Sequence, residues 1–156
     1  MRKILPLLTA LFALVFVSGG LAHAQYSPTI HAEIIPSADL MQPQALKQLL
    51  DAKKAPAMFQ VGSRLFFSEA HISGSTYAGP GSSEQGLDLL QKAVAHMPKG
   101  KLIVLYCGCC PWDRCPNVGP AWKHLHDLGY TNVKVLYLAH NFGDDWVAKG
   151  YPTERQ

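Results

Sequence analysis

The chain has 156 residues, of which 48% are hydrophobic and 16% are charged, and its formal net charge is +3. This length is enough for one domain with a hydrophobic core. The weak charge excludes the strongly basic surface that nucleic acids or anionic membranes require, so we expect neither as a partner.

The first residues have the features of an export signal. Arg2-Lys3 is basic, residues 4–17 are almost wholly apolar, and Ala22-His23-Ala24 has the small-x-small pattern of a cleavage site. A transmembrane anchor is the alternative, but the apolar run is short for a bilayer. We therefore expect residues 1–24 to be a signal peptide that is removed. The remaining residues 25–156 would form one exported domain, periplasmic or secreted, nearly neutral in charge and without a membrane span.

Strands and helices are expected to alternate along the rest of the chain. Short apolar runs predict strands at residues 32–35, 57–61, 102–106 and 132–138. Apolar residues at helical spacing predict helices at residues 43–54, 84–98, 118–128 and 144–149, and a polar, glycine-marked loop covers residues 69–75. This alternation predicts an α/β fold with a mostly parallel sheet, helices on both faces, and a ligand site at the carboxyl ends of the strands.

The third of these strands leads directly into the cysteines. Residues 102–106 are apolar, which is typical of a strand buried on both faces, and Cys107 follows at its end. Asn117 can cap the next helix, and Pro120 falls in the first turn of that helix, where proline is tolerated. A thiol between a buried strand and a helix amino end is placed where thiolates are stabilised.

All the cysteines of the chain lie between Cys107 and Cys115. In an oxidising compartment they could form two disulfides. Disulfides that support a scaffold, however, usually close long loops, and bonds within this short segment would close very short ones. The spacing therefore favours reactivity or metal binding over scaffolding.

Four segments of the chain resemble the rhodanese-like domains, in the order of that family. They are His71-Ile72-Ser73-Gly74-Ser75, the strand that ends in Leu105-Tyr106-Cys107, the helix-to-strand junction from Leu125 to Val133, and Trp146-Val147-Ala148-Lys149-Gly150-Tyr151-Pro152. Together they span roughly residues 34–152. The resemblance implies a three-layer α/β fold and sulfurtransferase activity. It also implies a small sulfur-containing anion as donor and a thiol or protein as sulfur acceptor.

The chain differs from the family pattern in two places. Gln60-Val61-Gly62-Ser63 stands where the family has Asp-x-Arg, so we expect that structural ion pair to be absent. The cysteine loop is several residues longer than the active loop of the family.

His71 is expected to order its own loop by hydrogen bonds rather than to act as a base.

Cys107 corresponds in position to the nucleophile of the family, and we prefer it as persulfide carrier over Cys109 or Cys110. A sulfurtransferase needs a thiolate that attacks a sulfane sulfur and holds it as a persulfide. The other residues expected to bind the substrate anion belong to the same loop; they are Gly108, Cys109, Cys110, Trp112 and Arg114. For Arg114 an ion pair with Asp113 in solvent is the alternative, and for Trp112 it is simple packing.

The remaining thiols leave two further interpretations open. Cys109, Cys110 or Cys115 can resolve the persulfide as a disulfide, or the loop can carry a local disulfide such as Cys110 with Cys115. The second interpretation is a metal-binding or redox-sensing module without turnover. In that module Cys107, Cys109, Cys110 and Cys115 would bind Cu or Zn. Under the preferred interpretation no cofactor is expected. An inactive fold kept for partner binding is a third alternative.

Overall fold

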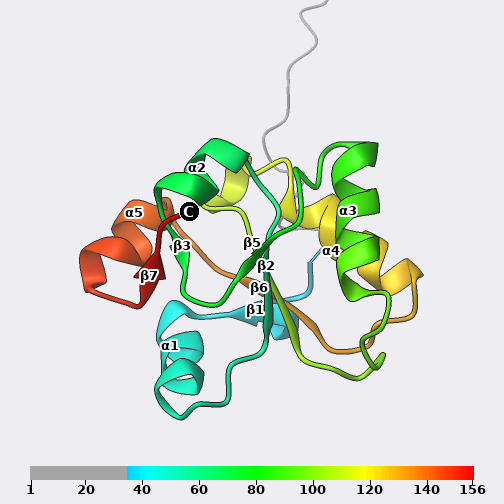
Figure 1. Ribbon diagram of the computed structural model, residues 1–156, viewed down its shortest axis with the longest axis horizontal. Coiled ribbons are helices and arrows are strands. Elements are labelled where there is room, and N and C mark those ends of the chain that lie inside the picture. Colours follow the sequence, from blue (N-terminus) through cyan, green and yellow to red (C-terminus); the bar gives the residue numbers. More distant parts are fainter. Residues whose placement is uncertain (1–34) are drawn as a thin grey trace, which may run out of the picture.

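The computed structural model describes residues 35–156, and Figure 1 shows their arrangement. The predicted signal peptide and most of the predicted strand at residues 32–35 lie outside them. The strands are β1 (Leu40–Met41), β2 (Ala57–Gln60), β3 (His71–Ile72), β4 (Thr76–Tyr77), β5 (Ile103–Tyr106), β6 (Val133–Leu136) and β7 (Thr153–Glu154). The α-helices are α1 (Pro43–Asp51), α2 (Arg64–Glu69), α3 (Glu84–Val94), α4 (Val118–Asp127) and α5 (Phe142–Asp145). Three short 3-10 helices are η1 (Ser37–Asp39), η2 (Trp112–Arg114) and η3 (Val147–Lys149).

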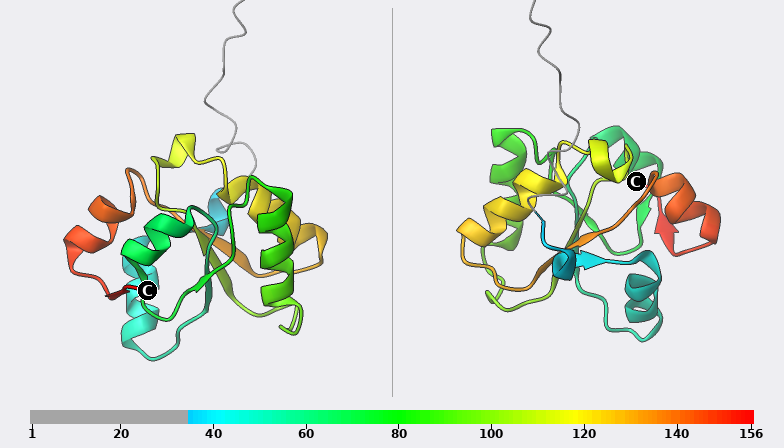
Figure 2. Two further views of the ribbon diagram at one scale, coloured as in Figure 1. Left: turned by 45° about the horizontal axis from the view of Figure 1, so that its top comes forward. Right: turned by 180° about the vertical axis from the view of Figure 1, so that it is seen from behind.

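A parallel sheet of five strands, in the order β1-β6-β5-β2-β4, forms the centre of the molecule. All residues of β5 are buried, because this strand lies in the middle of the sheet between β2 and β6. Its alternate side chains enter two different hydrophobic clusters. Ile103 and Leu105 pack with α3 and α4 on one face, and Val104 and Tyr106 pack with α1 and α5 on the other. The predicted three-layer α/β fold is therefore confirmed (Figures 1 and 2).

The helix after the cysteines begins at Val118, and Pro120 lies in its first turn as predicted. At α3, Ser83 caps the helix, and its side chain accepts a hydrogen bond from Gly86 N. Among the described residues, no helix is both long and apolar enough to span a lipid bilayer.

Several short elements differ from the prediction. The edge strand that pairs with β6 is Leu40–Met41, whereas Ile35 is buried in the core without belonging to a strand. Residues 69–75 were expected to form only a loop, but they contain β3, which pairs antiparallel with β7. Helix α2 and strand β4 were not predicted. These elements are too short to show a hydrophobic period, and the two short strands depend on partners distant in the sequence.

The last predicted helix, residues 144–149, is divided into two. Helix α5 begins at Phe142, because the side chain of Asn141 accepts a hydrogen bond from Asp144 N and caps the helix there. The chain leaves α-helical geometry at Trp146, whose fully buried side chain packs in the core, and continues as η3. This division places Phe142 and Val147 beside the end of β5.

Candidate functional site

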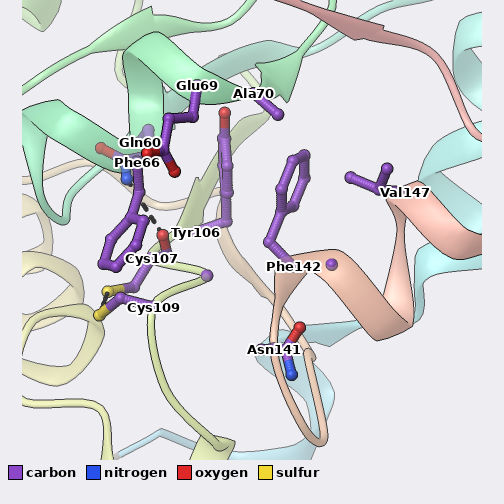
Figure 3. Close-up of a pocket in the computed structure, with 12 residues that line it drawn as sticks. Gln60, Phe66, Glu69, Ala70, Tyr106, Cys107, Cys109, Asn141, Phe142 and Val147 are labelled. Atoms are coloured by element: carbon purple, nitrogen blue, oxygen red, sulfur yellow. Dashed lines mark hydrogen bonds between the residues drawn. The ribbon is translucent and has the colours of Figure 1, made fainter.

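Cys107 follows β5 at the carboxyl edge of the parallel sheet, where a ligand site was predicted. The residue is only 5% exposed, yet it lies at the wall of a cavity of about 350 Å³ (Figure 3). The residues that line the cavity are Gln60, Phe66, Glu69, Ala70, Tyr106, Cys107, Gly108, Cys109, Asn141, Phe142, Gly143 and Val147. The thiol is therefore buried but faces a cavity that a substrate can enter.

Helix α2 forms one wall of this cavity, and α5 with η3 forms the opposite wall. Figure 3 shows Phe66 and Glu69 extending from α2 on one side, and Phe142 and Val147 from α5 and η3 on the other. Tyr106 lies between them. Its hydroxyl lies 2.7 Å from Ser75 Oγ and accepts a hydrogen bond from Ile72 N, and burial raises the pKa of Tyr106 to about 12. Tyr106 is therefore a neutral wall of the cavity at physiological pH.

The amide of Gln60 joins the ends of β2 and β5. Its Nε2 donates to the carbonyl oxygen of Cys107 over 3.1 Å, and its Oε1 accepts from Gly62 N. Gly62 has no room for a side chain, because a Cβ there would lie 2.9 Å from Cys107 Sγ. Gln60 and Gly62 thus hold the backbone beside the thiol at the position where the sequence lacks the Asp-x-Arg of the family.

Three thiols lie close together at this point. The Sγ atoms of Cys107 and Cys109 are 3.1 Å apart, and those of Cys109 and Cys110 are 3.3 Å apart. All three sulfur atoms lie within 4.8 Å of one another, whereas Cys115 is outside this group. All four cysteines are free thiols in this structure.

The turn at Gly108 brings the sulfur atoms together. Its φ of +85° is in the left-handed region that favours glycine. A Cβ at this position would also lie 2.7 Å from the Cβ of Phe142. The close approach of the cysteine loop to α5 therefore requires a glycine.

Asn117 occupies the N-cap position of α4 as predicted, but its side chain does not cap the helix. The backbone of Asn117 is already helical, and its side chain makes no capping hydrogen bond. Instead, Nδ2 donates to Cys107 Sγ over 3.3 Å, and Oδ1 accepts from Ser82 N over 3.1 Å. The side chain is 94% buried between these two loops, so it serves the thiol rather than the helix.

The neighbouring thiols determine where negative charge resides. Hydrogen bonds from Cys109 and then Cys110 lower the pKa of Cys107, against the opposing effects of the Cys115 contact and of burial. The same contacts raise the pKa values of Cys109 and Cys110, because these thiols are needed as donors to the Cys107 thiolate. Among Cys107, Cys109 and Cys110, negative charge is therefore favoured on Cys107, which has two thiol donors beside it.

Cys115 occupies a separate position at the amino end of α4. Its contact with Cys107 and the N–H groups of Asn117 and Val118 lower the pKa of Cys115 to about 7. The backbone N–H groups that we expected to act on Cys107 thus act on Cys115. With Cys110 and Trp112, Cys115 lines a second, much smaller cavity that also touches Cys107.

The structure places the other predicted loop residues as follows. Gly108 and Cys109 line the large cavity with Cys107, while Cys110 and Trp112 line the small one. Trp112 is half-buried against Tyr137, with ring centroids 5.4 Å apart. Arg114 is exposed on η2 and is not among the residues that line either cavity.

Sequence reasoning missed the cavity residues outside the cysteine loop, chiefly Gln60, Phe66, Glu69, Phe142 and Val147. Only Gln60 had a usable signal, because it lies near the end of a predicted strand, and β2 pairs with the cysteine strand. As expected, His71 orders its own segment: its Nδ1–H donates to the carbonyl oxygen of Phe67 over 2.8 Å, and the two rings stack.

The chain matches the family model described as "Rhodanese-like domain" over residues 39–138. In fold it is similar to the solution structure of a rhodanese-like domain from Anabaena sp., with 22% identity and a TM-score of 0.57, covering 76% of this chain and 80% of that one. A crystal structure of the same Anabaena protein gives 24% identity and a TM-score of 0.55, covering 74% and 91% of the two chains.

A thiosulfate sulfurtransferase from Pseudomonas aeruginosa is also similar in fold. It has 23% identity and a TM-score of 0.55, and the match covers 75% of this chain but only 20% of that longer one. No curated protein sequence matches the chain significantly.

Proposed function

Because the chain belongs to the rhodanese-like domain family, we propose that it is a sulfurtransferase of the cell envelope that carries sulfane sulfur as a persulfide on Cys107. One observation carries the proposal. The Cys107 thiol lies at the carboxyl end of the central strand, faces a cavity large enough for a substrate, and has hydrogen-bond donors at its sulfur.

The reaction has two steps. The Cys107 thiolate attacks the outer sulfur of a sulfane donor, a new S–S bond forms on Cys107, and the donor leaves as its thiolate or as sulfite. A second thiolate, from a small molecule or a protein, then attacks the outer sulfur of the persulfide and regenerates the Cys107 thiolate. Donors at Cys107 Sγ support both steps, because they stabilise the thiolate as nucleophile and as leaving group.

Cys109 supplies an internal alternative to the second step. Its sulfur, 3.1 Å from Cys107 Sγ, is close enough to attack that atom once Cys107 carries a persulfide. A Cys107–Cys109 disulfide would form and hydrosulfide would leave, with the Cys109 proton transferred to the departing sulfur. An external dithiol would then have to reduce the disulfide before another cycle. We prefer Cys109 for this role because of its short distance from Cys107 Sγ, although Cys110 and Cys115 also contact the Cys107 thiol.

The test is mass spectrometry of the reduced protein after exposure to benzyl persulfide and, separately, to thiosulfate, with alkylation to trap persulfides. We expect one added sulfur atom on Cys107 in the wild-type chain and in Cys115→Ser. In Cys109→Ser the Cys107 persulfide should persist longer, because the internal attack is removed. No added sulfur on any cysteine of the loop would overturn the proposal.

Export is part of the same proposal, and it rests on the features of residues 1–24. The amino-terminal sequence of the protein recovered from the periplasm or the medium should begin at Gln25. A chain recovered in the cytoplasm with its first residues intact would contradict this part alone.

A metal site is the second candidate function, and the grouping of the Cys107, Cys109 and Cys110 sulfur atoms favours it. Thiolates at such spacing suit Cu(I), or Zn with a further ligand. Purified protein should then contain stoichiometric metal that Cys109→Ser loses and Cys115→Ser retains. Metal and persulfide would compete, because both use the Cys107 sulfur.

A further inference from the structure

We propose that the sulfur donor is an organic persulfide, R–S–SH, with an apolar carbon group R, rather than a small inorganic anion. This inference rests on the proposed function of Cys107. It comes from the chemistry of the cavity beside the thiol, which offers apolar walls and a carboxylate, but few free hydrogen-bond donors.

The polar side chains that line the cavity are already engaged elsewhere. The amide of Gln60 is held by Cys107 O and Gly62 N, and the Tyr106 hydroxyl by Ser75 and Ile72. Asn141 uses its Oδ1 to accept from Asp144 N, and its Nδ2 donates to the Asp144 carboxylate. An oxyanion in the cavity would therefore find no free side-chain amide or hydroxyl to replace its hydration, and that exchange is unfavourable.

The charge of the cavity also disfavours anions. Among the described residues, no lysine, arginine or histidine lines it, and its one charged side chain is Glu69. Figure 3 shows Glu69 extending from α2 toward the cavity beside Tyr106. Arg64 of the same helix lies over the ring of Tyr77 instead, 4.9 Å from its centroid, and lines a different cavity. A dianion such as thiosulfate would meet repulsion and no partner cation.

The remaining walls suit a carbon group. Phe66 is 46% exposed and Val147 is 42% exposed, which is unusual for large apolar side chains at a cavity. Phe142 completes the apolar surface on the side of α5. A bound aryl or alkyl group would cover this surface, and burial of apolar area contributes about 25 cal/mol per Å². The volume of about 350 Å³ is also larger than a small inorganic anion would fill.

One sulfur atom passes from the organic persulfide to Cys107 in a single displacement. The Cys107 thiolate attacks the outer sulfur of R–S–SH, the S–S bond of the donor breaks, and its electron pair leaves with R–S⁻. Cys107 Sγ then carries the transferred sulfur as a persulfide, –S–SH, and R–S⁻ takes a proton from water. No outside oxidant or reductant is needed, because the sulfane sulfur passes between two thiols at one oxidation level.

The experiment compares two donors with the same reacting sulfur, benzyl persulfide and para-carboxybenzyl persulfide, and measures by mass spectrometry the rate of persulfide formation on Cys107. Thiosulfate is the third donor. We expect benzyl persulfide to react about fivefold faster than its carboxylate analogue, and thiosulfate to be the slowest. Glu69→Gln should bring the two benzyl donors to nearly equal rates, while Phe66→Ala should slow both benzyl donors and leave the thiosulfate rate unchanged.

Glu154→Gln is the matched control, since Glu154 is an exposed carboxylate in another cavity, and this variant should leave all rates unchanged. Circular dichroism would verify that each variant is folded. Equal rates for the two benzyl donors in the wild-type chain, or thiosulfate as the fastest donor, would overturn the inference and leave the persulfide proposal standing. If none of the donors loads Cys107, the proposed function itself fails.

Discussion

Helix α2 separates two cavities of opposite chemical character. The thiol cavity, lined by Cys107 and described above, has apolar walls and one carboxylate. Another cavity, of about 430 Å³, is the edge cavity, which is lined by Arg64, Phe67, His71, Ser75, Thr76, Tyr77, Glu154, Arg155 and Gln156. Consecutive residues on a helix point in directions about 100° apart, and so Phe66 lines the thiol cavity and Phe67 the edge cavity.

A sulfurtransferase with an anionic donor needs basic side chains and a thiol at one site. Here these two kinds of group line different cavities. The edge cavity holds arginine side chains and His71, whose Nε2 lies 3.7 Å from Glu154, but it has no thiol. The thiol cavity holds the nucleophile and no basic side chain among its described lining residues. An anion attracted to the edge cavity would be held away from Cys107. We therefore expect the surroundings of the thiol, and not the weak positive charge of the whole chain, to determine the substrate.

The largest expected effect tests whether sulfur chemistry is confined to the thiol cavity. Cys107→Ser should abolish persulfide formation by benzyl persulfide, because no other cysteine combines a lowered thiol pKa with a place at this cavity. Arg64→Gln, which changes the edge cavity from the same helix as Phe66, should leave the rate within about twofold. Both rates are measured by mass spectrometry of alkylated protein. A marked fall in Arg64→Gln would show that the two cavities act together.

The next largest effect is expected on stability, in a comparison of Gly74 and Gly108. Both glycines have a left-handed backbone, and one lies beside each cavity. Gly74 has a φ of +78°, and a Cβ there would come no closer than 4.0 Å to Met58, whereas a Cβ on Gly108 would clash with Phe142. Gly74→Ala should lower the free energy of unfolding by about 1–2 kcal/mol through backbone strain alone. Gly108→Ala should lower the free energy of unfolding by about 1–3 kcal/mol more than Gly74→Ala, because overpacking against Phe142 adds to the backbone strain.

Urea denaturation of both variants measures this difference. Equal losses would mean that the approach of the cysteine loop to Phe142 is easily relaxed.

A smaller effect is expected on the ionisation of the Cys107 thiol. Asn117→Asp keeps an acceptor for Ser82 N but replaces the donor to Cys107 Sγ with a carboxylate, so the pKa of Cys107 should rise. The rise should move the pH profile of iodoacetamide alkylation about one pH unit towards higher pH. In the wild-type chain the reaction should persist to lower pH than for an ordinary thiol and fall as pH drops through the lowered pKa.

Asn117→Ala is the control for this variant, since it removes the donor without adding charge and should give a smaller rise. An unchanged pH profile in Asn117→Asp would mean that the amide does not stabilise the thiolate.

The smallest effect is expected in the edge cavity. Glu154→Gln removes the contact with His71, but the Glu154 side chain is 55% exposed and therefore screened by water. The free energy of unfolding should change by less than about 0.5 kcal/mol. Thermal denaturation would detect a larger change, and such a change would show that β3 and β7 depend on this side-chain contact more than on their backbone hydrogen bonds.

The order strand, cysteine, helix could be predicted from the sequence, and so could the three-layer parallel fold. Residues 102–106 show their burial through an unbroken apolar run, and the helices α1, α3 and α4 show it through apolar residues at helical spacing. These are local signals, since hydrophobic periodicity reflects how a segment sits against the core, whatever its partners are. The position of Cys107 at the carboxyl edge of the sheet follows from the same pattern.

Only the tertiary structure decided what surrounds Cys107. Glu69 and Phe142 are more than 70 residues apart in the sequence and meet across the cavity because α2 and α5 both pack beside the end of β5. Asn117 has the residue type of a helix cap, but the loop that carries Ser82 offers its side chain a buried partner and turns it toward the thiol. Polar partners and cavity walls are chosen by which segments pack together, and a pattern within one segment carries no information about that choice.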